Sequence, residues 1–231
     1  MAECAQPYRY ADHFLRVLAV GDCANLLHQE LEKDPDLQFY LQMNCETLPD
    51  VESHNVIGEI KGSDFPDEII VLGGHLDSWD LGEGAQDDGA GVVQAMEVLH
   101  LFNTIGYKPK RTIRVVAWMN EENGMRGALK YAEAAKEKGE IHIAGVESDR
   151  GGLTPRGFTV DANDAVFAAV SQWADLLKPY MLHDIIRGYG GVDISPLREH
   201  GTPLFGFLPD SQRYCDFHHA ASDVFEAVNK R

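Results

Sequence analysis

The residues best suited to chemistry in this chain are histidines and carboxylates that follow apolar segments. Imidazole nitrogens and carboxylate oxygens, with no thiolate among them, suit zinc best, with cobalt or manganese as substitutes. Their types therefore indicate a metal site, and the surrounding elements must explain how they meet. The candidates are His75, Asp77, Asp87, Asp88, Glu121, Glu122, Asp149, His218 and His219.

Three predicted strands deliver most of these side chains to one edge of a sheet. The run at 69–72 reads IIVL, which has the length and composition of a fully buried parallel strand. Two more strands are expected at 112–118 and 141–149. Because α/β folds place ligands at the carboxyl ends of their strands, we expect the side chains found there to form one constellation. They are His75 and Asp77, Glu121 and Glu122, and Asp149.

A glycine-rich loop at 82–89 connects the first of these strands to a helix that begins near Gly89, and it carries Asp87 to the start of that helix. His75 and Asp77 lie two residues apart, so on an extended chain they point to the same side. Both need not touch a metal, because a carboxylate beside a ligating imidazole usually orients the ring instead.

The other segments complete an α/β pattern. Two extended segments without a helix between them, 37–43 and 53–60, predict an antiparallel edge on an otherwise parallel sheet. The expected fold is α/β, with a mixed, mostly parallel central sheet flanked by helices on both faces. We also expect helices at 22–33, 127–138, 164–177 and around 196–200, a polar turn at 61–68, a glycine-rich loop at 187–193 and a strand at 202–208.

Composition limits the classes of function. A formal net charge of −17 repels phosphate backbones and anionic lipid, which argues against nucleic-acid and membrane partners. The sequence contains no run of 18 or more apolar residues, so no membrane-spanning helix is predicted. The N-terminus is a poor signal peptide, so a cytoplasmic location is expected unless a targeting segment has been lost. The four cysteines form no CxxC pair, and Cys215 is expected to be a free, partly buried thiol.

Four motifs in order are much more specific than any one alone. They read HLDSWDLGEGAQDDGAG, WMNEENGMRGA, ESDRGG and HHAASD. Together they resemble the M28 family of co-catalytic zinc aminopeptidases, most closely its plasma glutamate carboxypeptidase branch. The resemblance covers about 51–228 and implies a zinc-exopeptidase fold over 51–231, after a weakly patterned segment at 1–50 that we expect to share one compact domain with it. Members of the family are mostly secreted or periplasmic.

The resemblance also implies a ligand set for two Zn²⁺ ions. Asp87 rather than Asp88 would bridge both ions, because the family's bridging carboxylate stands four positions before a glycine, here Gly91. His219 rather than His218 would be a ligand, because the family's histidine is followed four positions later by an acidic residue, as it is here. The implied roles are metal binding by His75, Asp87, Glu122, Asp149 and His219, general-base catalysis by Glu121, and orientation of His75 by Asp77.

This ligand set implies a dizinc metallo-exopeptidase acting on dipeptides or short peptides with a free N-terminus. Two divalent ions about 3.5–4 Å apart can share one water and lower its pKa toward neutrality. Glu121 would take the proton from that water and pass it to the leaving amine. In the substrate pocket, Tyr189 is a candidate oxyanion donor, and Asp193 is either a loop cap or a substrate-binding carboxylate.

Each motif alone also has a purely structural interpretation. Two aspartates among glycines suit an ordinary turn, and two glutamates suit a helix N-terminus. Independent preferences for turns and helix termini do not explain why every type of metal ligand is predicted at the same edge of the sheet. Two alternatives to the peptidase remain: a single-zinc aminoacyl transferase of the glutaminyl-cyclase type and a non-catalytic peptide-binding domain of the same family. The oligomeric state is open, with a homodimer as one alternative. The remaining histidines, expected to be structural, are His54, His100, His142, His183 and His200.

Overall fold

The computed structural model describes residues 22–38, 40, 42, 44 and 46–229, and the chain divides into two units, Met1–Glu52 and Ser53–Arg231. In the first unit, helix α2 (Asp22–Lys33) confirms the helix predicted there. Residues 37, 38, 40 and 42 form no strand, so the strand predicted at 37–43 is wrong for its described residues, and 39, 41 and 43 lie outside them. An alternating pattern is not sufficient, because a strand also needs a neighbour that receives its hydrogen bonds. The predicted single domain over both units stays a prediction.

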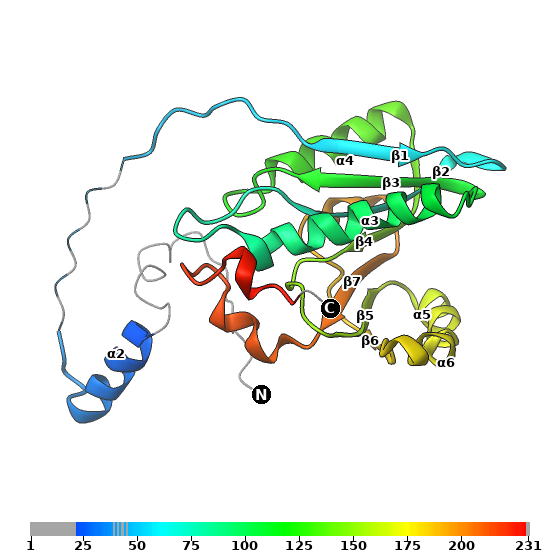
Figure 1. Cartoon of the computed structure of the whole chain (residues 1–231). Helices are drawn as coiled ribbons and strands as arrows, with labels where there is room; N and C mark the ends of the chain where they lie inside the picture. Colours follow the sequence, from blue (N-terminus) through cyan, green and yellow to red (C-terminus); the bar gives the residue numbers. More distant parts are fainter. Residues whose placement is uncertain (1–21, 39, 41, 43, 45, 230–231) are drawn as a thin grey trace. The chain divides into compact units, whose positions relative to one another are not determined.

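In the described part of the second unit, seven strands form one sheet (Figure 1). They are β1 (Val56–Ile60), β2 (Phe65–His75), β3 (Arg111–Trp118), β4 (Ile141–Glu147), β5 (Pro155–Asp161), β6 (Asp184–Arg187) and β7 (Leu204–Pro209). Their order is β1-β3-β2-β4-β7-β5-β6. The pairs β1–β3 and β5–β7 are antiparallel, and the other pairs are parallel. This confirms the predicted mixed, mostly parallel sheet and the antiparallel edge formed by the segment at 53–60.

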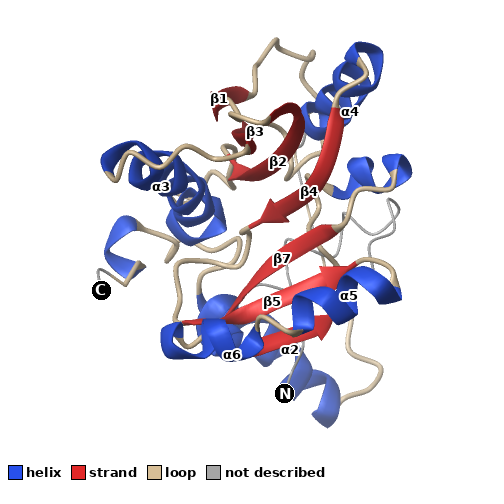
Figure 2. Cartoon of the chain, turned by 90° about the vertical axis from the view of Figure 1, so that its right-hand side faces the viewer, coloured by secondary structure: helices blue, strands red, loops and turns tan. Residues whose placement is uncertain are grey.

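Helices cover both faces of the central strands (Figure 2). Helix α3 (Ala90–Thr104) packs on one face against β2 and β3, and α4 (Arg126–Lys138) packs on the other. The main hydrophobic core lies under α4, where Ala128 and Tyr131 meet Val116 and Trp118. Seven consecutive residues of β3 are buried, as expected of a strand covered on both faces.

Two strands of the sheet have no counterpart in the sequence prediction. Strand β5 contains Pro155 and Gly157, which are typical of loops, and β6 is only four residues long. A side chain at position 157 would collide with the main chain of Asp184 in β6. The glycine that resembles a loop signal is therefore what allows these two strands to approach each other.

The helix predicted at 164–177 is interrupted. It consists of α5 (Asp164–Ser171) and α6 (Ala174–Leu177). Between them the main-chain N–H of Trp173 donates to the carbonyl of Val170 at 2.9 Å, a tighter i to i+3 bond that breaks the α-helical series. The apolar period continues through this break, which is why the pattern predicted one helix.

The remaining elements are short. Strand β2 begins at Phe65, inside the segment predicted as a polar turn. The short 3₁₀ helices are η2 (Lys178–Tyr180), η3 (Ser195–His200), η4 (Ser211–Asp216) and η5 (Phe225–Ala227), and η3 confirms the short helix expected there.

Two observations complete the description of the chain. Cys215 is disulfide-bonded, so the expectation of a free thiol is wrong, because spacing alone does not reveal which cysteines meet in space. Among the described residues, none of the helices combines the length and apolar character that crossing a membrane requires.

A buried polar network joins α4 to the sheet. Arg114 donates to the Tyr131 hydroxyl at 3.0 Å, and that hydroxyl lies 2.7 Å from Nε2 of His142. The hydroxyl thus connects the Arg114 guanidinium to the His142 ring. Burial lowers the pKa of His142 to about 4. As predicted, this histidine is structural.

This network predicts a specific loss of stability in acid. The pKa of His142 lies below its unfolded value, so its contribution is fully present above about pH 6.5 and is lost as the pH falls toward 4. Between those limits we expect the free energy of unfolding to fall by about 2 kcal/mol more in the wild-type chain than in His142→Gln. Urea unfolding at several pH values measures this, with His100→Gln on exposed α3 as control. Parallel pH profiles for wild type and His142→Gln would contradict it.

Candidate metal centre

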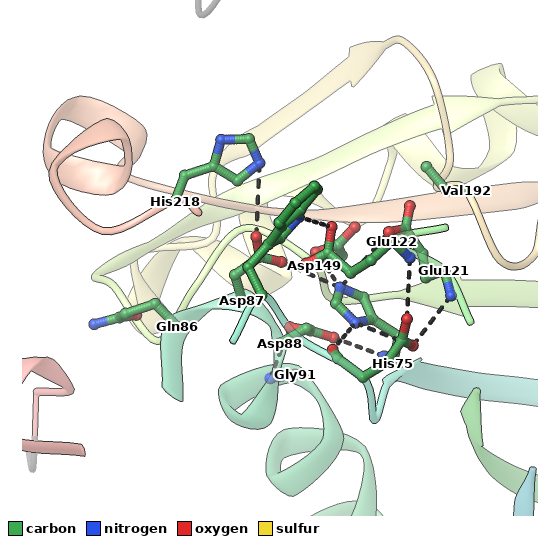
Figure 3. A network of polar contacts seen from close by, with 12 residues as sticks. His75, Gln86, Asp87, Asp88, Gly91, Glu121, Glu122, Asp149, Val192 and His218 are labelled. Carbon is green, nitrogen blue, oxygen red and sulfur yellow. Dashed lines mark hydrogen bonds and ion pairs between the residues drawn. The ribbon is translucent and has the colours of Figure 1, made fainter. Parts of the chain in front are cut away.

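The carboxyl ends of β2, β3 and β4 meet at one edge of the sheet, as the sequence predicted (Figure 3). Strand β2 ends at His75, Glu121 and Glu122 lie in the turn after β3, and Asp149 follows β4 by two residues. Parallel pairing of these strands brings side chains together that are far apart in the sequence.

Asp87 lies at the centre of this cluster, in the irregular turn η1 (Ala85–Gly89). Its Oδ1 is 3.1 Å from Nε2 of His75, and its Oδ2 is 3.4 Å from Nε2 of His219. His75 Nε2 is also 3.5 Å from Asp149 Oδ1, and His219 Nε2 is 3.0 Å from Glu122 Oε2. Two histidine–carboxylate pairs therefore face the two oxygens of one carboxylate. We call them the inner pair, His75 with Asp149, and the outer pair, His219 with Glu122.

The donor atoms fit a divalent cation. Two buried oxygens, Asp87 Oδ2 and Glu122 Oε1, have no hydrogen-bond partner among the described residues. Burying an oxygen without a partner is costly, and a bound cation removes that cost. Nitrogen and carboxylate donors without thiolate suit zinc. Three sets of ligand atoms lie within 4.8 Å of one another: Asp87, His218 and His219; His75, Asp87 and Glu122; His75, Asp88 and Asp149.

Asp88 differs from Asp87 in its partners. Its two oxygens accept the main-chain N–H groups of His75 at 3.0 Å and of Gly91 at 3.1 Å. A side chain at position 91 would collide with Asp88 and with the carbonyl of Ser148, so this close approach requires glycine. Asp88 thus joins β2 to the start of α3, while Asp87 keeps an oxygen free of donors. The bridging role of Asp87 stays a prediction.

Both neighbouring histidines reach the cluster. Their rings stack at 3.8 Å, and Nε2 of His218 is 3.6 Å from Asp87 Oδ2. His219 is nearer to that oxygen and also contacts Glu122. Its φ of 58° is unusual for a residue other than glycine, so the surrounding contacts hold it in place. The choice of His219 as ligand stays a prediction that this geometry favours.

Asp77 acts differently from the prediction. The atom that orients the His75 ring is the main-chain carbonyl of Asp77, 2.7 Å from Nδ1, whereas its carboxylate is 3.9 Å away. The carboxylate instead accepts the main-chain N–H groups of Asn120 at 2.8 Å, Glu121 at 3.1 Å and Glu122 at 3.2 Å. It therefore positions the turn that carries both glutamates.

The electrostatics of the cluster are those of crowded carboxylates. Burial, with the nearby charge of Asp149, raises the pKa of Glu121 to about 7. Burial alone would lower the pKa of His75, but its contacts with Asp149 and Asp87 outweigh this and raise it. A divalent cation would instead favour neutral histidine and ionised carboxylate, since those are the forms that bind metals.

The two predicted substrate residues lie in the loop after β6. The Tyr189 hydroxyl interacts with Ser195, and its role as an oxyanion donor stays a prediction. Asp193 is 1% exposed, and neither carboxylate oxygen has a partner among the described residues. It is therefore no loop cap, because a cap accepts a main-chain N–H. Burial, with the nearby Glu147, raises its pKa. A substrate-binding role stays a prediction.

Several supporting residues have roles that their sequence positions did not predict. Glu147 accepts the main-chain N–H groups of Val192 at 2.6 Å and Ile194 at 2.9 Å, which fixes the loop after β6. Its position two residues before Asp149 at a strand end was the available signal. Asp223 accepts the N–H groups of Gln86 at 2.6 Å and Asp87 at 3.1 Å. Trp79, which contacts the outer pair, carried no signal of its own.

Comparisons with known proteins agree on one relationship. The model of Peptidase family M28 matches residues 55–231. Carboxypeptidase Q of Rattus norvegicus is 33% identical over 208 residues, which cover 90% of this chain and 44% of that protein. The crystal structure of a peptidase M28 precursor from Shewanella amazonensis SB2B is 36% identical, with a TM-score of 0.71, and the match covers 76% of this chain and 40% of that one.

A zinc aminopeptidase from Bacillus subtilis shares the fold at 21% identity, with a TM-score of 0.59 over 76% of this chain and 45% of that one. The chain thus spans less than half the length of the curated relatives it resembles.

The contacts of Asp77 generate a prediction about stability. Asp77→Ala removes the acceptor of three main-chain N–H groups, so we expect a loss of about 2–4 kcal/mol in the free energy of unfolding. Asp77→Asn keeps one acceptor oxygen and should lose less. Urea unfolding of the metal-free chain measures both, with the exposed neighbour Asp80→Ala as control. If Asp77→Ala is as stable as Asp80→Ala, the carboxylate does not hold this turn.

Proposed function

The chain belongs to peptidase family M28, and from that premise we propose that it is a zinc-dependent metallo-exopeptidase that hydrolyses dipeptides or short peptides with a free N-terminus. The family predicted from the four sequence motifs is the family to which the chain belongs. The names of its relatives, a carboxypeptidase and an aminopeptidase, both describe removal of a terminal residue, which supports exopeptidase action.

One observation carries the proposal: two histidine–carboxylate pairs lie against opposite oxygens of Asp87. In a two-metal site, the inner pair would hold one ion, the outer pair the other, and Asp87 both. When bound, two such ions polarise a carbonyl and make a water more acidic. The partnerless oxygens of Asp87 and Glu122 support this assignment.

Glu121 is the residue placed to move the proton. Its carboxylate Oε2 is 4.0 Å from Nε2 of His75, and its side chain is 14% exposed, so it borders the cluster without lying at its centre. Asp77 fixes its main chain. From this position a carboxylate can accept a proton from the attacking water and then return it to the leaving amine.

Replacing Glu121 tests this role. Glu121→Gln keeps the shape of the side chain but cannot accept the proton, so kcat should fall by about 10²- to 10⁴-fold. The measurement is hydrolysis of unblocked dipeptides and an aminoacyl-nitroanilide, together with elemental analysis of the purified chain. We expect two equivalents of zinc in both wild type and Glu121→Gln. Glu137→Gln, on the exposed side of α4, is the matched control and should keep full activity.

Other results would favour the alternatives. Wild-type chain that takes up one zinc and cyclises N-terminal glutamine without hydrolysing dipeptides would indicate the glutaminyl-cyclase type of chemistry. Wild-type chain that binds peptide but turns over none, even after zinc or cobalt is added, would indicate a non-catalytic binding domain. Full activity in Glu121→Gln would remove this residue from the mechanism.

A further inference from the structure

Trp79 lies in the loop after β2, beside the outer pair. Its indole Nε1–H donates a hydrogen bond of 2.7 Å to Glu122 Oε2. Its ring centre is 5.2 Å from that of the His219 imidazole, with an angle of 48° between the rings. One side chain therefore contacts both members of the outer pair.

The hydrogen bond from Trp79 fixes the orientation of the Glu122 carboxylate. The torsion at the end of a glutamate side chain is soft, so packing alone does not fix which oxygen points where. Oε2 receives the indole N–H and lies near His219, whereas Oε1 is buried without a partner among the described residues. Oε1 is thus the oxygen left to bind a cation.

The inner pair has no comparable dependence on a loop side chain. His75 is 1% exposed, and the main-chain carbonyl of Asp77 holds its ring. The outer pair is partly exposed, since His219 is 19% exposed as a side chain, and Trp79 beside it is 40% exposed. A cavity of about 10 Å³, close to the size needed for one water molecule, lies between Trp79, Asp87 and His219.

We propose that Trp79 is a positioning residue for one of the two metal sites: its indole N–H orients Glu122 and its ring supports His219. The proposal rests on the two-metal function proposed above. Loss of the N–H weakens binding of the ion held by the outer pair. Binding of the ion held by the inner pair stays unchanged, because Trp79 is hydrogen-bonded to the outer pair and not to His75.

Trp79→Phe tests this, because phenylalanine keeps an aromatic ring and lacks the N–H donor. The control is Trp173→Phe, at the exposed turn between α5 and α6. Both variants and the wild type are stripped of metal and titrated with Zn²⁺ in competition calorimetry. We expect one of the two equivalents to bind about 10- to 100-fold more weakly in Trp79→Phe, with the other unchanged. Raising free zinc should restore its turnover, because what is lost is metal binding.

A spectroscopic measurement tests the same contact by a readout other than metal affinity. Paramagnetic Co²⁺ quenches the emission of tryptophans close to it, and the chain has three tryptophans. In wild type and in Trp173→Phe, one of the two equivalents of Co²⁺ should quench a component of the emission that comes from Trp79. That component should be absent from Trp79→Phe.

The outcomes separate this proposal from the one on which it rests. Equal weakening of both equivalents in Trp79→Phe, or of neither, overturns the role of Trp79 while the two-metal function stands. The role of Trp79 is also overturned if Co²⁺ quenches no emission component in the wild type that is absent from Trp79→Phe. If the wild-type chain itself binds fewer than two equivalents, both proposals are wrong.

Discussion

Carboxylates crowd together at one edge of the sheet, and their mutual repulsion governs how the surrounding loops and side chains are arranged. Burial raises the pKa values of most of these carboxylates, because ionised groups lose their hydration and repel one another. Only a few imidazoles offset that charge, so the site is electrostatically incomplete without cations. The carboxylic acids with a raised pKa are Asp88, Glu121, Glu147, Asp149, Asp193 and Asp223.

The fold makes this crowding tolerable by giving four of the carboxylates a structural task. Asp77, Asp88, Glu147 and Asp223 each accept two or more main-chain N–H groups, and each thereby fixes a different segment around the site. Hydrogen bonds to an ionised acceptor are stronger than those between neutral groups. The carboxylates without such donors are the ones left for chemistry, so the division between support and ligand follows from where the main-chain amides point.

That division explains what the sequence could predict. Apolar runs in the sequence predict strands that end at or shortly before His75, Glu122 and Asp149. Because parallel strands bring their carboxyl ends to one edge of a sheet, the proximity of these three residues could be predicted. Which atom of Asp77 orients His75 could not be predicted, because residue spacing places side chains but does not assign hydrogen bonds. Strand β5 was missed for a related reason: its glycine serves a contact with β6 that exists only in the folded chain.

The two halves of the site also differ in what holds them together. The inner pair comes from central strands that pair along their length. The outer pair joins the turn after β3 to a C-terminal segment that reaches η1 through Asp223, and this segment is further tied by Phe225, whose N–H donates to Glu83 at 2.9 Å. A cation bound by the outer pair would link segments distant in sequence, so its binding free energy would also stabilise their docking. The affinity of the outer pair for a cation and the docking of the C-terminal segment are therefore thermodynamically linked.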